Sequence, residues 1–309
     1  MRYAIGRIAY AISLMAATIF LSFILFHLVP TDPARIALGP NASQAQVAAL
    51  RVQLGLDQPW PVQLAGYLRA LFRGDLGRSF IDGRAVGPEV AIRLSVSAAL
   101  TLLASAIAGI WVIAQASVSS DVRAPRAFAW ANSLFTAFPT MFVAAVALAW
   151  LLPHYRWDYF PGTLGSVGAW AFLLLPASVL ALYPMGILGK IMDREFSRLA
   201  ARPFVEAGRA RGLSPGQILW RHMTPNALIP LLSGWVTLLP ILLTGSFIIE
   251  IMFSVPGLGA LLLRSVLNRD LPMLQGVAII ATALAVVLHL VVELAYPAID
   301  PRIVGGGRE

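Results

Sequence analysis

Cysteine is absent from the 309 residues, and charged residues make up only 12% of them. Without cysteine the chain has no disulfides, no thiolate zinc sites and no cysteine-ligated iron–sulfur cluster. Hydrophobic residues account for 58% of the sequence, which is more apolar surface than one soluble core can bury. The composition therefore predicts that lipid is the solvent for most of the chain.

Lysine is almost absent too, and this excludes one kind of nucleotide chemistry. The sole lysine, Lys190, is followed by Ile191, whereas a phosphate-binding G-x-x-x-x-G-K-[ST] loop needs a hydroxyl residue there. The four histidines lack H-x-x-x-H spacing, and the sequence has no G-x-S-x-G elbow. We therefore predict a chain that is not an enzyme and holds no metal or cofactor, so that any ATP hydrolysis occurs on another polypeptide.

The formal net charge of +8 could indicate nucleic-acid binding. The arginines, however, stand at the ends of apolar runs and do not form a basic face with interleaved aromatic residues. This pattern favours contact with membrane lipid and argues against a nucleic-acid partner.

Six long apolar segments are present. Crossing a hydrocarbon core of ~30 Å takes about 20 apolar residues, and the sequence offers such runs at 8–29, 94–117, 129–152, 167–189, 231–253 and 273–297. We predict an all-α membrane protein with six transmembrane helices. Four prolines inside these runs are expected to interrupt the helices or line a pathway: Pro139, Pro176, Pro184 and Pro240.

The distribution of basic residues predicts the orientation. Short loops on the cytoplasmic side of a membrane carry an excess of Lys and Arg. The basic residues on one predicted side are Arg2, Arg7, Arg123, Arg126, Lys190, Arg194, Arg198, Arg202, Arg209, Arg211, Arg221, Arg302 and Arg308, against Arg156, Arg264 and Arg269 in the short opposite loops. Both termini are therefore expected to be cytoplasmic.

Two connections are too long to be simple turns. Residues 30–93 carry short apolar-periodic stretches at 47–54 and 61–72, which predict small amphipathic helices in an external cap between helices 1 and 2. Residues 190–230 form a basic cytoplasmic loop between helices 4 and 5. We expect breaks in that loop at Pro203, at Ser214-Pro215-Gly216, at Pro225 and at Pro230.

A run of small residues in the second loop, Ala207, Gly208, Ala210 and Gly212, predicts a short helix without bulky side chains. Another protein's groove could close tightly on such a backbone. The alternative is a basic helix that lies on anionic lipid headgroups, because arginines flank the same run.

These residues resemble a known family. Glu206-Ala207-Gly208-x-x-x-Gly212, followed by Pro225, is similar to the "EAA" motif of binding-protein-dependent ABC importer permeases. Further motifs resemble the dipeptide, oligopeptide and nickel group of that family from end to end of the chain. They are Leu54-Gly55-Leu56-Asp57-x-Pro59, Gly74-Asp75-Leu76-Gly77-x-Ser79, Arg221-His222 with Asn226-Ala227-Leu228 and Pro230, Glu250 with Phe253-Ser254 and Pro256-Gly257-Leu258-Gly259, Asn268-Arg269-Asp270-x-Pro272 with Gln275-Gly276, and Asp300-Pro301-Arg302.

The resemblance implies a single permease domain over residues 1–309 in a bacterial inner membrane. It implies a heterodimer with a second related permease, two cytoplasmic ATP-binding subunits and an extracytoplasmic solute-binding protein. The pair would move peptides or similar small solutes by alternating access. The residues expected to couple to the ATPase are Glu206, Ala207, Gly208, Arg209 and Gly212.

An ion-coupled secondary transporter or channel that works without an ATPase is the alternative. Such a protein would be expected to show inverted repeats or charge pairs inside the membrane. The sequence shows neither pattern clearly.

Overall fold

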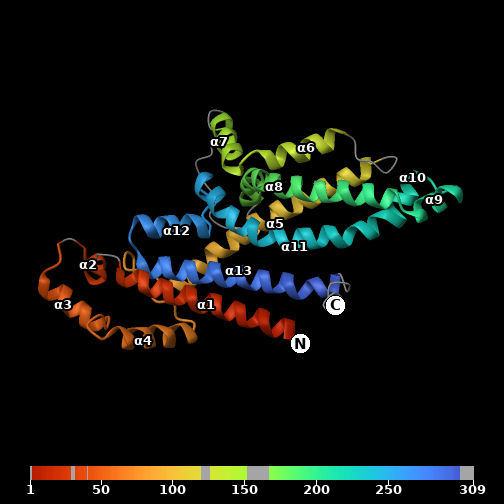
Figure 1. Ribbon diagram of the computed structural model, residues 1–309. Coiled ribbons are helices and arrows are strands. Elements are labelled where there is room, and N and C mark those ends of the chain that lie inside the picture. The colour runs from red at the N-terminus through yellow and green to blue at the C-terminus, as the bar shows by residue number, and fades with distance from the viewer. Residues whose placement is uncertain (1, 29–31, 40, 120–125, 152–166, 300–309) are drawn as a thin grey trace. The chain divides into compact units, whose positions relative to one another are not determined.

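The computed structural model describes residues 2–28, 32–39, 41–119, 126–151 and 167–299 (Figure 1). Within these ranges the chain is almost entirely helix and turn, and the one β-type pairing is an isolated bridge between Arg78 and Ala85. The predicted all-α fold is therefore confirmed.

Five stretches of helix are long and apolar enough to cross a membrane. They are Gly6–Ile24 in α1 (Arg2–Leu28), all of α5 (Val86–Val118), Trp170–Ala200 in α8 (Val167–Ala200), Pro215–Met252, and Leu271–Val291 in α13 (Leu271–Ile299). Each overlaps one of the predicted segments. Long apolar runs thus became helices because only internally hydrogen-bonded backbone is stable in lipid.

The remaining predicted span, 129–152, differs from a straight helix. It consists of α6 (Arg126–Ala137) and α7 (Thr140–Leu151), which are bent by 96° at a short break. Pro139 lies in that break, where its ring disfavours helical backbone at Phe138 and its nitrogen has no hydrogen to donate. The amides of Phe142 and Val143 then bond to the Pro139 carbonyl and begin α7.

Other prolines do not end their helices. Pro176 and Pro184 lie inside α8, and Pro240 lies inside α11 (Thr224–Met252). The break predicted at Pro230 is wrong, because this residue also lies inside α11. The break predicted at Pro225 is wrong as well, because α11 continues from the preceding π-helical turn without interruption and Pro225 lies in its first turn. A π-helical turn over Leu219–Met223 joins α11 to the short helix before it.

The packing divides the chain into two compact units. The first comprises Met1–Val96 and Pro256–Val287, and contains α1, the predicted cap and α12 (Leu258–Leu267). The region predicted to be the cap contains three helices: α2 (Pro33–Leu38), α3 (Gln44–Gln53) and α4 (Trp60–Phe72). The two predicted amphipathic stretches correspond to α3 and α4. Residues 86–93, in contrast, already belong to α5.

Polar contacts hold this unit together. Asp32 caps α2 and pairs with Arg51 of α3 at 3.0 Å. The His27 ring of α1 lies 3.0 Å from the Gln63 Oε1 of α4. At the other end of the sequence, the Gln275 amide donates to the Ser22 carbonyl at 2.8 Å, so α13 is tied to α1.

The second unit comprises Ser97–Val255 and Leu288–Glu309. Within it α8 packs against both α6 and α11. Its fully buried side chains include Leu173, Leu188, Phe196 and Ile249. Residues 190–200, predicted as the start of a loop, are the last turns of α8, which ends at Ala200. The long helices α8 and α11 therefore both lead directly to the short helices α9 and α10 (Figure 1).

Candidate functional site

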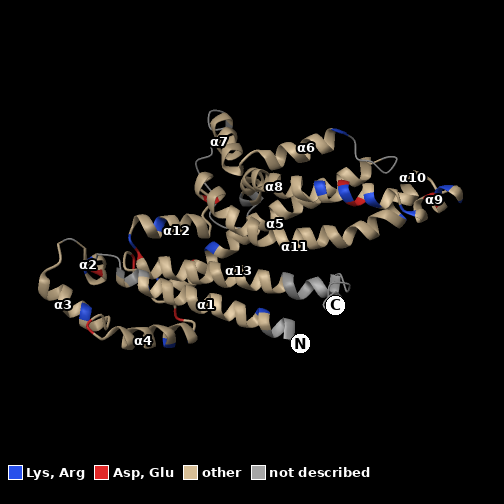
Figure 2. Ribbon diagram, viewed as in Figure 1, with Lys and Arg blue, Asp and Glu red and all other residues tan. Residues whose placement is uncertain are grey.

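The segment that carries the EAA-like residues is a short helical connection between α8 and α11. It consists of α9 (Pro203–Ala210) and α10 (Pro215–Ile218), and we call residues 201–218 the connecting segment. Basic side chains gather at this end of the second unit (Figure 2).

Local sequence determines where α9 begins and ends. Pro203 stands at its first position, where a fixed φ suits the helix and no donor is lost. At the other end the Gly212 amide bonds to the Arg209 carbonyl, and the Leu213 amide bonds to the Gly208 carbonyl. This pair of bonds is a Schellman cap, which requires a left-handed residue after the helix. Gly212 supplies it with a φ of +76°.

One face of α9 is buried against the rest of the segment. Val205 and Gly208 are buried on that face. A Cβ built on Gly208 would lie 3.3 Å from the nearest side-chain atom of Ile218, in α10. The absent side chain at Gly208 therefore serves packing inside the segment. The sequence-based interpretation of Gly208 as part of an outward small-residue surface is corrected accordingly.

The other face of α9 is open. Glu206, Ala207 and Arg209 are all exposed there. Neither Glu206 nor Arg209 forms an ion pair with any residue that the structure describes, and Phe204 is 37% exposed on the same short helix. The predicted residues thus divide into an outward group, Glu206, Ala207 and Arg209, and two glycines that shape the helix.

The chain leaves the connecting segment through a second capped helix. The backbone amide of Gln217 donates a hydrogen bond to the Ser214 hydroxyl at 3.3 Å, and the backbone amide of Ser214 donates one to the Gln217 side-chain oxygen at 2.9 Å. This capping box satisfies two end groups of α10. The predicted break at Ser214-Pro215-Gly216 is therefore the start of a helix. Trp220, in the π-helical turn that follows, is 47% exposed.

Sequence reasoning missed the aromatic side chains Phe204 and Trp220. Their signal was available, since each is a large apolar residue next to several arginines in a segment outside the predicted spans. Partly exposed aromatic and arginine side chains are enriched at the centres of protein interfaces.

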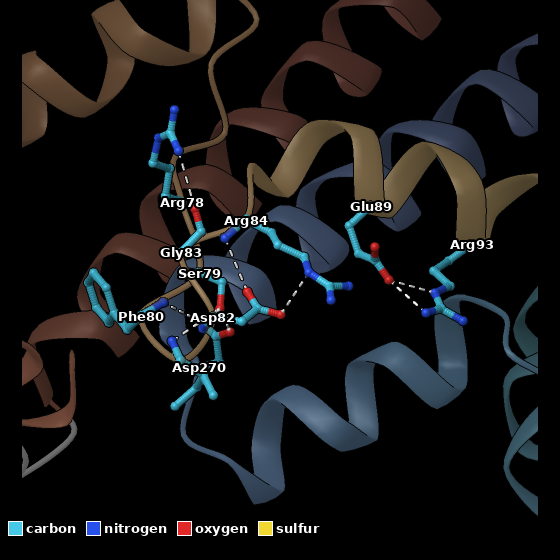
Figure 3. A network of polar contacts seen from close by, with 10 residues as sticks. Arg78, Ser79, Phe80, Asp82, Gly83, Arg84, Glu89, Arg93 and Asp270 are labelled. Atoms are coloured by element: carbon cyan, nitrogen blue, oxygen red, sulfur yellow. Dashed lines mark hydrogen bonds and ion pairs between the residues drawn. The ribbon is translucent and has the colours of Figure 1, made fainter. Parts of the chain in front are cut away.

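The first unit brings two further motifs together, although they lie far apart in sequence (Figure 3). Ser79 ends the Gly74-to-Ser79 motif and Asp270 lies in the Asn268-to-Pro272 motif. The Ser79 hydroxyl donates to Asp270 Oδ2 at 2.5 Å, and the Phe80 amide donates to Oδ1 at 3.2 Å. Ser79 and Asp270 are 5% and 6% exposed, so the contact is shielded from water.

The same unit contains an ion pair on α5. Glu89 and Arg93, one turn apart on α5, approach to 2.7 Å. Arg93 also donates to the Pro256 carbonyl at 3.3 Å, which ties α5 to the motif that precedes α12. The Asp300-Pro301-Arg302 motif lies outside the described residues.

Comparison with known proteins explains this co-occurrence of motifs. Residues 105–305 match the model of the binding-protein-dependent transport system inner membrane component, and residues 1–101 match that of the N-terminal part of such membrane components. The chain belongs to this family. It is therefore a non-catalytic permease subunit of an ABC importer, as predicted, and a multi-pass inner-membrane protein that works with other ABC components.

Similar relatives extend over nearly the whole permease. A putative peptide transport system permease protein of Brucella abortus is 35% identical, over 96% of this chain and 97% of the relative. A glutathione transport system permease protein of Salmonella typhimurium is 30% identical, over 98% of this chain and 99% of the relative. A probable peptide ABC transporter permease protein of Sinorhizobium fredii is 29% identical, over 97% and 98%.

Proposed function

We propose that α9 is the helix through which an ATP-binding subunit drives this permease. In this role Glu206, Ala207 and Arg209 contact the ATPase. Gly208 and Gly212 act by shaping the helix that presents them. The contact lies on the cytoplasmic side, which requires both chain termini to be cytoplasmic as well.

The observation that carries the proposal is the open face of α9. A short helix, capped at its C-terminal end and packed on α10 through Gly208, projects charged side chains that find no ion-pair partner among the described residues. A rigid element of this kind is suited to insertion into a groove.

The helices that flank the segment suggest how force is transmitted. The 34-residue α8 and the 29-residue α11 pack together and lead to the two ends of the connecting segment. A displacement of α9 therefore acts on both helices. ATP binding and hydrolysis would bias the bundle between two states, as alternating access requires.

The assembly that follows contains four kinds of subunit: this chain, a related permease, two ATP-binding subunits and an extracytoplasmic solute-binding protein. Residues 30–93 and the first turns of α5 would then face the binding protein. The substrate class we propose is a peptide or a similar small solute, in keeping with the peptide and glutathione transport functions in the names of the similar proteins.

A bulky substitution on the open face of α9 tests the docking proposal. Ala207→Trp would separate the two proteins, and we expect co-purified ATPase to fall by about tenfold or more. Ala48→Trp, on the exposed surface of α3, is the matched control and should leave the ATPase bound. If Ala207→Trp retains the ATPase, docking at α9 is wrong, and the alternative of a basic helix that lies on anionic lipid headgroups is favoured.

The orientation is tested with single cysteines, because the natural chain has none. In intact cells, a membrane-impermeant thiol reagent should label Ala48→Cys on α3 and should leave Arg209→Cys on α9 unlabelled. Labelling of position 209 alone would reverse the proposed topology.

A further inference from the structure

A polar cluster that is fully buried at two of its side chains and half-buried at the third joins three helices of the second unit. Gln115 of α5 and Asn132 of α6 are each 0% exposed, and they meet Asp193 of α8. The Gln115 side-chain amide donates to Asp193 Oδ1 at 2.7 Å, and the Asn132 side-chain amide donates to Oδ2 at 3.3 Å. Polar groups buried in this way are costly unless each is bonded.

Every amide hydrogen of the cluster has an acceptor. The second Gln115 N–H reaches the Gly189 carbonyl at 3.2 Å, and the second Asn132 N–H reaches Gln115 Oε1 at 3.1 Å. The Trp111 indole N–H completes the set by donating to Asn132 Oδ1 at 2.9 Å. Each oxygen of Asp193 accepts one of these bonds. Such a network specifies one arrangement of the helices, because any shift leaves a buried donor unpaired.

Glycines on α8 make the close approach possible. A Cβ on Gly189 would lie 2.3 Å from Asn132 Oδ1, and a Cβ on Gly186 would lie 2.6 Å from Thr136 Cγ2. The sole lysine, Lys190, donates a hydrogen bond to the Thr136 hydroxyl beside them. The sequence thus places small and polar residues where α6 crosses α8.

We infer that Asp193 is a positioning residue for transport: through Gln115 and Asn132 it fixes α5 and α6 to α8. A displacement received at α9 passes along α8, which ends at Ala200, seven residues after Asp193. With the cluster intact, α5 and α6 follow α8 as one body. With the cluster broken, α8 moves without them, and ATP is hydrolysed without movement of α5 and α6. The inference rests on the proposed docking of the ATPase at α9.

The decisive readout is transport per ATP hydrolysed by the complete importer in proteoliposomes. Asp193→Asn keeps the size of the side chain but replaces one acceptor oxygen with an NH₂ that faces a donor. We expect ATP hydrolysis per assembled complex to stay within about twofold, while transport per ATP falls by about tenfold. A merely structural role would lower the yield and thermal stability of the complex but leave this ratio unchanged.

A charge-matched control lies on the same helix. Glu195→Gln removes a carboxylate two residues away, whose partner is Arg198 on α8 itself. This variant should keep the transport ratio of the unaltered protein. If transport per ATP falls equally in both variants, the loss comes from the changed charge of α8, and the inference is overturned.

A reciprocal exchange tests the contact itself. Gln115→Glu alone sets two carboxylates together and should lower the transport ratio. Combined with Asp193→Asn, it reverses donor and acceptor across the 2.7 Å contact and should recover part of the ratio. Trp111→Phe is the milder variant to use if Asp193→Asn does not assemble, because it removes only the hydrogen bond from the indole to Asn132. We expect transport per ATP to fall in this variant too, but by less.

The failures of the inference and of the docking proposal are distinguishable. If Asp193→Asn transports as many solutes per ATP as the unaltered protein, the positioning role is wrong whatever α9 does. If instead Ala207→Trp keeps the ATPase bound, docking at α9 is wrong. A pH gradient alone, without ATP, should drive no transport by the unaltered protein. In that case a loss of transport in Asp193→Asn is not explained by proton coupling through Asp193, and the positioning role stands.

Discussion

The hydroxyl of Ser79 donates a hydrogen bond to the carboxylate of Asp270 at 2.5 Å, across 191 residues of sequence. Both side chains are buried, and the Phe80 amide adds a second bond to the same carboxylate. The turn that precedes α5 is thereby fixed to the turn between α12 and α13. Two motifs that look independent in the sequence are therefore the two halves of one structural contact.

Asp270→Asn should loosen this turn. The carboxylate accepts one bond on each oxygen, and asparagine retains only one acceptor, so we expect a loss of about 1–3 kcal/mol in local stability. Trypsin cleavage after Arg78 and Arg84 in the purified complex should become faster. Asp57→Asn, at an exposed position before α4, is the control. Equal cleavage rates in the two variants would contradict the prediction.

Gly276→Ala should destabilise the first unit by overpacking. A Cβ there would lie 2.3 Å from Cγ1 of Val86, the first residue of α5, and a clash of this kind typically costs about 1–3 kcal/mol. Thermal unfolding of the complex measures the loss. Adding Val86→Ala removes the clashing methyl group, so the double variant should be more stable than the sum of the single effects predicts. Strict additivity would show that the two residues do not interact.

Gly212 should tolerate asparagine better than valine. Nothing lies within 4 Å of a Cβ at this position, so a side chain would not be crowded. The strain in a substituted residue would come from the backbone φ of +76°. Left-handed backbone costs an ordinary side chain roughly 1–2 kcal/mol, and asparagine less. ATPase retention should therefore decrease in the order glycine, asparagine, valine. Equal retention in the two variants would indicate that the Schellman cap is dispensable for docking.

Asp82 should contribute to acid sensitivity of the turn before α5. Desolvation is the largest single influence and raises the pKa of Asp82, but the Arg84 amide, the Ser79 hydroxyl and the positive charges of Arg84 and Arg264 together hold the pKa below its usual value. A carboxyl with a depressed pKa stabilises the folded state above its unfolded pKa, and this stability is lost as the pH falls through the folded pKa. The difference in amide hydrogen-exchange protection of residues 79–84 between the unaltered protein and Asp82→Asn should therefore shrink below about pH 4. A difference that is constant down to pH 2 would contradict this.

Much of the fold follows from sequence alone. The apolar runs 8–29, 94–117, 167–189, 231–253 and 273–297 predict helical spans because backbone in lipid has no other way to satisfy its hydrogen bonds. The missing phosphate-binding loop places ATP hydrolysis on another chain, and the small residues near Glu206 indicate a short helix. Local rules of this kind depend on residues a few positions apart, so they can be read along one segment.

Only the tertiary structure decided which side chains meet. Whether Gly208 faces a partner protein or Ile218 depends on how α9 folds back on α10. Whether Pro139 only kinks one continuous helix or separates two helices that are bent by 96° depends on the packing around it. The contacts of Ser79 with Asp270, and of Gln115 and Asn132 with Asp193, join segments from 61 to 191 residues apart. Spacing along the chain cannot show such pairs, because their distance is determined by how whole helices cross and by the glycines that let them approach.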